Sequence, residues 1–151
     1  MTSNNKIVKV AIRIDAPASD VLSAFTDADK MSQFWFHRGD DGMKQGDPAT
    51  FILGAGEDAF SFDVAVIELD FPNKLVIEWQ GPDGHNTQVT WTCAEAEGST
   101  ILTIEESGFI GNDENITERI IDSTGGFSQV IVAAKALIEH GVSVNVVAAH
   151  P

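Results

Sequence analysis

The order of strand-like and helix-like patterns along the chain is the feature that most constrains its fold. Apolar and polar residues alternate in several stretches, two short helical stretches follow the first of these, and one long amphipathic stretch comes last. Alternation with a period of two indicates strands, whereas apolar residues at i, i+3, i+4 and i+7 indicate a helix. This order predicts an α+β fold in which a curved antiparallel sheet wraps around one long C-terminal helix. We expect a cavity between sheet and helix, and apolar cavities are common small-molecule sites.

The first predicted strand covers residues 7–14, where apolar residues alternate with polar ones such as Lys9 and Arg13. The other predicted strands cover residues 50–53, 59–70, 75–80, 87–94 and 100–106. The breaks between them contain residues typical of tight turns, for example Pro72 and Gly84. Such short connections join neighbouring antiparallel strands, so we expect a meander.

Two short helices are expected after the first strand. Pro17 stands at an early helical position, where its missing N–H is not needed. Asp27 can cap a second helix that reaches Trp35. Residues 37–42 are predicted to form a loop because Gly and Asp dominate there.

The last amphipathic stretch ends near His140. Its predicted buried stripe consists of Phe127, Val130, Ile131, Ala134, Leu137 and Ile138. Gly125 and Gly126 interrupt the stretch, and each Gly costs ~1 kcal/mol relative to Ala in a helix interior. We therefore predict a kink or a close approach at these glycines, with a separate first segment over residues 113–123 and the gripped helix over residues 127–138.

The chain is interpreted as one domain over residues 1–151, with a polar tail (1–5), a core (6–141) and an apolar tail (142–151). A single domain of this length buries ~70% of its unfolded surface. The apolar tail needs burial, because an ordinary terminus is polar and frayed. It either covers the sheet of its own chain, or it pairs with an exposed sheet edge or packs on a second copy, and a two-fold homodimer is the commonest outcome of the latter.

The composition argues against several partners. The formal charge is −14 with only nine Lys and Arg, which is unsuited to nucleic acid or to an anionic membrane surface. No stretch approaches the ~20 apolar residues of a membrane span, and residues 1–6 lack the apolar segment of a signal peptide. We expect a cytoplasmic protein without metal or cofactor. Cys93 is interpreted as a buried, inert thiol because it alternates with apolar residues.

Five motifs in a fixed order carry a family resemblance. They are residues 14–17 with Val21 and Phe25, Trp35, residues 71–79 (FPNKLVIEW), residues 98–104 with 107–109, and residues 126–127. In these motifs the chain resembles the START-like SRPBCC superfamily, and within it the bacterial relatives of the activator of the ninety-kilodalton heat-shock-protein ATPase. The resemblance covers residues 7–141. Phe127 stands where the family has Trp, and Phe71 where a first Pro is usual.

The resemblance implies the helix-grip fold, in which a six- or seven-stranded antiparallel sheet wraps around the C-terminal helix. The space between them often holds an apolar ligand. Members of the superfamily include lipid carriers, hormone receptors, polyketide cyclases and co-chaperone domains. The fold therefore does not determine the function.

Large apolar side chains are expected to face the cavity. The candidate ligand-binding residues are Trp35, Phe60, Phe62, Val64, Trp79, Trp91, Leu102, Ile104, Phe127, Ile131 and Ala134. So many aromatic rings suit a flat apolar ligand. For any one of these residues, simple filling of the core is the alternative.

Glu106 and His37 are the weak catalytic candidates. The strand register places Glu106 on the apolar face beside Ile104, where a carboxylate could orient a ligand or act as a base. The simpler interpretation, which we prefer, is that the strand has reached its rim and Glu106 is solvated. His37 follows Trp35 near the predicted mouth of the cavity.

Three functions remain open. The preferred one is the binding or carriage of a small apolar molecule in the cavity. The alternative is a co-chaperone-like protein-interaction module, which the family resemblance implies and which would need a chaperone partner. The third is a cyclase- or hydrolase-like enzyme that uses the same cavity. An enzyme is less favoured. The sequence shows no nucleophile elbow, phosphate loop or dinucleotide fingerprint, but the cyclases of the superfamily work mainly by shaping a pocket, so this absence alone does not decide against catalysis.

Overall fold

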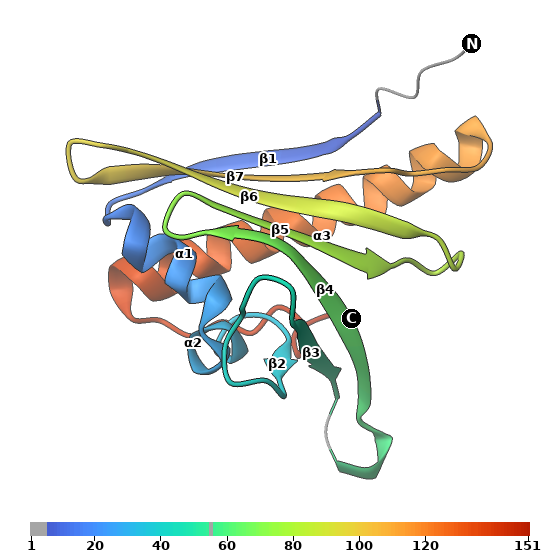
Figure 1. Ribbon diagram of the computed structural model, residues 1–151, viewed down its shortest axis with the longest axis horizontal. Coiled ribbons are helices and arrows are strands. Elements are labelled where there is room, and N and C mark those ends of the chain that lie inside the picture. The colour runs from blue at the N-terminus through green and yellow to red at the C-terminus, as the bar shows by residue number, and fades with distance from the viewer. Residues whose placement is uncertain (1–5, 55) are drawn as a thin grey trace.

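The computed structural model describes residues 6–54 and 56–151, which form one seven-stranded antiparallel sheet and three α-helices (Figure 1). The strands are β1 (Val8–Ile14), β2 (His37–Arg38), β3 (Pro48–Leu53), β4 (Phe60–Asp70), β5 (Lys74–Gln80), β6 (Asn86–Ala96) and β7 (Ser99–Ser107). The helices are α1 (Ala18–Thr26), α2 (Ala28–Ser32) and α3 (Asp113–His140), with a 3₁₀ turn, η1, at Gly56–Asp58.

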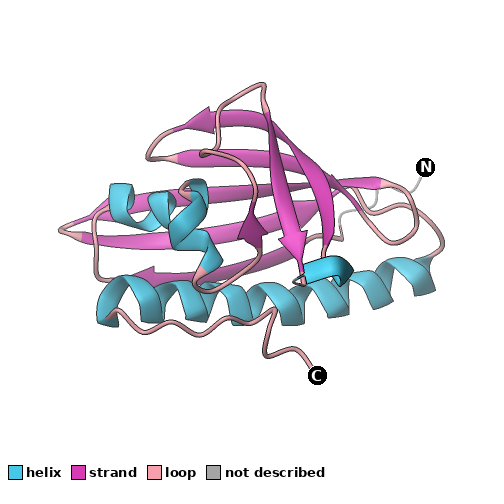
Figure 2. Cartoon of the chain, turned by 90° about the horizontal axis from the view of Figure 1, so that it is seen from below, coloured by secondary structure: helices cyan, strands magenta, loops and turns pink. Residues whose placement is uncertain are grey.

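The strands follow the order β1-β7-β6-β5-β4-β3-β2. The segment from β2 to β7 is therefore the expected meander, and β1 joins it by pairing antiparallel with β7. Figure 2 shows α3 lying along the curved sheet, with the two short helices packed at one end. This arrangement confirms the predicted helix-grip fold. Among the described residues, no helix is both long enough and apolar enough to cross a membrane.

Helix α3 is one continuous helix of 28 residues, so the predicted kink and separate first segment are wrong. Asn112 caps its start by accepting a hydrogen bond from the Asn115 N–H, and Gly141 ends it in the left-handed conformation (φ 66°). A side chain added at Gly125 or Gly126 would meet nothing within 4 Å, so neither glycine marks a close approach. Burial of apolar residues on both sides of the glycines, from Ile116 to Ala134, outweighs the ~1 kcal/mol that each Gly costs.

The aromatic core lies between α1, the loop after α2 and the sheet. Phe25 contacts Phe34, Trp35 and Trp91 with ring centroids 5.2–6.2 Å apart. Trp91 is fully buried, as are Leu102 and Ile104. Ring pairs of this kind add ~1 kcal/mol each beyond the area that they bury.

Phe60 departs from the prediction that it faces inward. Its side chain is 62% exposed and stacks only on the edge of the cluster, with its ring centroid 6.0 Å from that of Phe62. Phe60 pairs with Leu53 at the tip of the β3–β4 hairpin, and this tip extends beyond the neighbouring strands (Figure 1). The alternation of β4 is as predicted, but its first two residues are exposed.

Residues 37–42 were predicted as loop, but His37 and Arg38 form a short strand that pairs with β3. The Arg38 side chain is fully buried and forms an ion pair with Asp40 at 2.5 Å. Arg38 also donates to the Phe25 carbonyl at 2.8 Å. These tertiary contacts hold the segment in place, and a pair of residues is too short for a periodic signal.

The apolar C-terminal tail, residues 142–151, packs on its own chain. Asn145 Nδ2 donates to the carbonyls of Ser32 (3.0 Å) and Trp35 (2.8 Å). The Val146 N–H donates to the Phe34 carbonyl at 3.0 Å. The tail thus covers the loop after α2 rather than the sheet, while Val142 and Val144 stay about half exposed.

Candidate functional site

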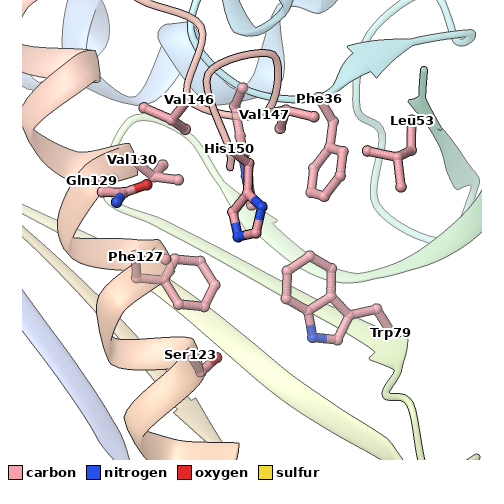
Figure 3. A pocket seen from close by; sticks show the side chains of 12 residues that line it. Phe36, Leu53, Trp79, Ser123, Phe127, Gln129, Val130, Val146, Val147 and His150 are labelled. Atoms are coloured by element: carbon pink, nitrogen blue, oxygen red, sulfur yellow. The ribbon is translucent and has the colours of Figure 1, made fainter. Parts of the chain in front are cut away.

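An apolar cavity of about 470 Å³ opens between α3, β5 and the C-terminal tail (Figure 3). Small-molecule sites range over roughly 300–1,000 Å³, so a compact ligand fits this volume. The cavity is lined mainly by carbon atoms. Its lining residues come from segments far apart in the sequence, namely the loop after α2, β3, β5, α3 and the tail.

Aromatic rings form its walls. Trp79, near the end of β5, and Phe127, in the middle of α3, stack with ring centroids 6.0 Å apart and an interplanar angle of 29°. Trp35 meets Phe127 edge-on at 5.9 Å. Phe36 and Leu53 continue the apolar wall on the side of β3 (Figure 3). These rings offer flat apolar surface that suits an aromatic or greasy ligand.

The tail supplies the remaining side of the cavity. Val146 and Val147 line it, and the His150 ring lies across the opening between Phe127 and Trp79 (Figure 3). Asn145 holds this segment, because its Oδ1 also accepts hydrogen bonds from the backbone N–H groups of Val147 and Ala148. The tail is therefore a fixed part of the site.

A polar cluster around Glu106 lies at one end of the cavity. The preferred expectation that Glu106 is solvated at a strand rim is wrong: its exposed fraction is 2%. Strand β7 continues to Ser107, and Glu106 is flanked by Val8 of β1 and Val89 of β6. The strand end that looked like a rim is thus enclosed by neighbours on both sides.

Three side chains donate hydrogen bonds to Glu106. Trp79 Nε1 and Thr87 Oγ1 reach Oε2 at 3.0 and 2.5 Å. The Ser123 hydroxyl donates to Oε1. Burying a carboxylate is costly unless donors replace its water, and hydrogen bonds to a charged acceptor are about twice as strong as neutral ones. The cluster ties β5, β6 and β7 to α3 and orients the Trp79 ring.

The structure separates the predicted ligand-binding residues into two groups. Trp35, Trp79 and Phe127 line the cavity. The others do not line it: Val64, Trp91, Leu102, Ile104, Ile131 and Ala134 are buried in the core, Phe62 is half-buried, and Phe60 is exposed.

Of the α3 residues that line the cavity, sequence reasoning identified only Phe127 as a ligand contact, and it missed the whole contribution of the tail. Ser123, Gly126, Phe127 and Val130 all line the cavity and follow the i, i+3, i+4, i+7 spacing of one helix face. The predicted break at the glycines hid that face. The tail gave no signal for its position, since alternation indicates burial but not the surface that provides it.

The two weak catalytic candidates do not form a pair. Glu106 lies in β7 and His37 in β2, with β6, β5, β4 and β3 between them in the sheet. His37 is exposed.

Burial raises the pKa of the Cys93 thiol to about 12, so this residue is an inert core thiol as expected. Over residues 6–54 and 56–151, no group of His, Cys, Asp or Glu side chains is arranged to hold a metal ion.

The sequence of this chain matches the model of a known family. A family model described as "Activator of Hsp90 ATPase homolog 1-like protein" matches residues 15–137. The chain belongs to this family. The resemblance carried by the five sequence motifs is confirmed by this match. Among curated proteins, none is similar enough to count as a match.

Solved structures share the fold. A Staphylococcus saprophyticus protein superposes with a TM-score of 0.75 at 22% identity, over 93% of this chain and 96% of that one. DynU16, from the dynemicin biosynthetic locus, gives 0.76 at 22% identity over 93% of this chain and 49% of that one. The Aha1 dimer from Colwellia psychrerythraea gives 0.70 at 14% identity over 90% and 98%. At these identities the likeness concerns the fold.

Proposed function

We propose that this chain binds or carries a small apolar molecule in the cavity between the sheet and α3. The observation that carries the proposal is an open volume of about 470 Å³ whose walls are aromatic and aliphatic. Protein interiors are normally packed to the density of organic crystals, and unfilled apolar walls forgo dispersion contacts. A bound apolar molecule would restore those contacts.

Gly126 strengthens the proposal. It lies on the cavity-facing side of α3, and an added side chain there would meet nothing within 4 Å. Ala in a helix interior is more favourable than Gly by about 1 kcal/mol, so helix stability alone would favour a larger residue. A glycine at this position keeps the volume open.

Gly125 offers a matched control for a binding experiment. Gly126→Leu should fill the cavity, whereas Gly125→Leu adds the same side chain one position away, at a site outside the lining that is equally free of contacts. The probe is Prodan, a neutral naphthalene fluorophore whose emission shifts in apolar surroundings. We expect saturable 1:1 binding to the parent protein and to Gly125→Leu, and none to Gly126→Leu. Equal binding by both variants contradicts the proposed site.

A protein-interaction role is the second candidate, and one surface favours it. A shallow apolar groove of about 400 Å³ runs along the outer side of α3 beside the tail. Val132, 56% exposed, and Val144, 47% exposed, form part of it. The family description points to an Hsp90-type chaperone as partner, and the charge of −14 would favour a basic patch on it.

The ATPase rate of an Hsp90-type chaperone tests this second role. Stimulation that Val132→Asp abolishes and Gly126→Leu leaves intact would assign it to the outer groove. No change in the ATPase rate at micromolar concentrations contradicts it. The cavity proposal is unaffected by either result, because Val132 lines only the groove and Gly126 lines only the cavity.

A further inference from the structure

The polar end of the cavity restricts which ligands it can accept. Ser123 is one of the few polar residues in the lining, and its hydroxyl hydrogen is donated to Glu106 Oε1. Figure 3 shows the Ser123 hydroxyl and the Trp79 indole nitrogen at the same end of the cavity. Glu106 itself is 2% exposed and stands behind them.

These hydrogen bonds determine whether each group can still donate or accept a hydrogen bond with a ligand. A hydroxyl has one hydrogen and two lone pairs, so Ser123, having used its hydrogen, offers only acceptor sites to the cavity. The indole N–H of Trp79 is directed at Thr87 Oγ1 and Glu106 Oε2, both at 3.0 Å. The Thr87 hydroxyl also donates to Glu106 and is 1% exposed. No donor of this cluster remains free for a ligand.

Resting on the proposed function, we infer that the ligand is an apolar molecule with a hydrogen-bond donor, a hydroxyl or an amino group, whose hydrogen bond Ser123 accepts at the end of the cavity next to Glu106. The Glu106 carboxylate strengthens this acceptor, because charge polarises a chain of hydrogen bonds. An anionic group is excluded from this end of the cavity, since its charge would face acceptor lone pairs and a carboxylate in surroundings of low dielectric constant.

A series of naphthalenes of similar size separates the effect of a hydrogen-bond donor on the ligand from the effect of a negative charge. The probes are 2-naphthol, which has a donor, 2-methoxynaphthalene, which has none, and 2-naphthoate, which is anionic; affinities are measured by isothermal titration calorimetry. A net hydrogen bond to a charge-assisted acceptor predicts about tenfold tighter binding of 2-naphthol than of 2-methoxynaphthalene. We expect 2-naphthoate to bind most weakly of the three.

Ser123→Ala removes the acceptor and should abolish the preference for 2-naphthol while 2-methoxynaphthalene keeps its affinity. Ser128→Ala is the matched control, because Ser128 lies on the same helix but borders the outer groove. It should keep the full preference. Thermal unfolding of each variant checks that the fold is intact.

The Glu106→Gln variant provides a more specific test, because it should reverse the ligand preference. The donor-only indole N–H of Trp79 requires the amide oxygen of Gln on its side, which turns the amide NH₂ toward Ser123. Ser123 then accepts from the protein and can donate into the cavity. The preference should reverse, with 2-methoxynaphthalene gaining affinity relative to 2-naphthol. A merely structural role of Glu106 would weaken both probes alike.

The outcomes distinguish the two proposals. Equal affinities for 2-naphthol and 2-methoxynaphthalene, unchanged by Ser123→Ala, overturn the donor requirement and leave the apolar site standing. Failure of all three naphthalenes and of Prodan to bind overturns the proposed function itself. A ligand preference that follows the Ser123 and Glu106 substitutions supports both.

Discussion

The indole N–H of Trp79 donates to Glu106 Oε2 at 3.0 Å, so a buried carboxylate on β7 sets the orientation of a ring that forms a cavity wall. Thr87, on the strand between them, donates to the same oxygen. The polar cluster and the apolar cavity are thus one structural unit. A change in either should be measurable in the other.

Glu106→Ala tests the cluster as a source of stability. It leaves the Thr87 hydroxyl buried without its acceptor and the Trp79 N–H with only Thr87 Oγ1, which should lower the free energy of unfolding by ~3 kcal/mol. Urea denaturation followed by tryptophan fluorescence measures the loss. Glu105→Ala is the control, because Glu105 is 42% exposed in a surface ion pair with Lys9 and such pairs contribute at most ~1 kcal/mol. Equal effects of the two substitutions would show that the cluster contributes little.

The fold was predictable because its signals are local. Alternation placed the long strands, the helical stripe placed Phe127 and Ile131, and turn residues implied the meander. Positions decided by tertiary contacts were not predictable. The burial of Glu106 depends on donors from three other elements, and β2 depends on an ion pair between Arg38 and Asp40.

The site was less predictable than the fold for the same reason. Of the strand residues proposed to line the cavity, only Trp79 does so, because the face that a strand turns inward is mostly covered by neighbouring side chains. Period and register identify a buried face, but they do not show where packing leaves a gap. The tail's contribution depends on Asn145, whose partners lie 110 and 113 residues away.

The Arg38–Asp40 pair predicts a pH dependence. Burial, the largest single effect, raises the pKa of Asp40, but the Arg38 hydrogen bond and charge, with the Thr50 and Gly42 N–H groups, together hold it below the ordinary value of 3.8. A carboxyl whose folded-state pKa is depressed contributes stability above its unfolded pKa and loses it as the pH falls through the folded value. Wild-type stability should therefore decline below about pH 4.

Asp40→Asn checks this assignment. The variant leaves the fully buried Arg38 guanidinium without its counter-ion, which should cost about 3 kcal/mol at neutral pH. Thermal midpoints measured from pH 3 to 7 should fall less steeply for the variant in the acid range than for wild type. Parallel curves for the two proteins would mean that other carboxyl groups cause the acid sensitivity.

The buried stripe of α3 predicts that the same substitution changes stability by very different amounts at two nearby positions. Ala134 is fully buried, so Ala134→Asp places an unpaired charge in the core and should cost several kcal/mol, enough to unfold the domain. Val132 is 56% exposed, so Val132→Asp should change stability by less than ~0.5 kcal/mol. Circular dichroism melts compare the two variants. An unchanged melt for Ala134→Asp would contradict the position of the gripped helix.

Asn145 is predicted to control access to the cavity through the tail. Its side chain makes four hydrogen bonds, two to the carbonyls of Ser32, at the end of α2, and Trp35, and two from N–H groups of the tail itself. Asn145→Ala removes all four, so amide exchange at Val146 should accelerate at least tenfold and Prodan should associate faster, because the segment bordering the opening is released. His150→Ala is the control: it removes the ring at the opening but keeps the Asn145 anchor, so exchange at Val146 should not change. Unaltered exchange in Asn145→Ala would show that the valines alone hold the tail in place.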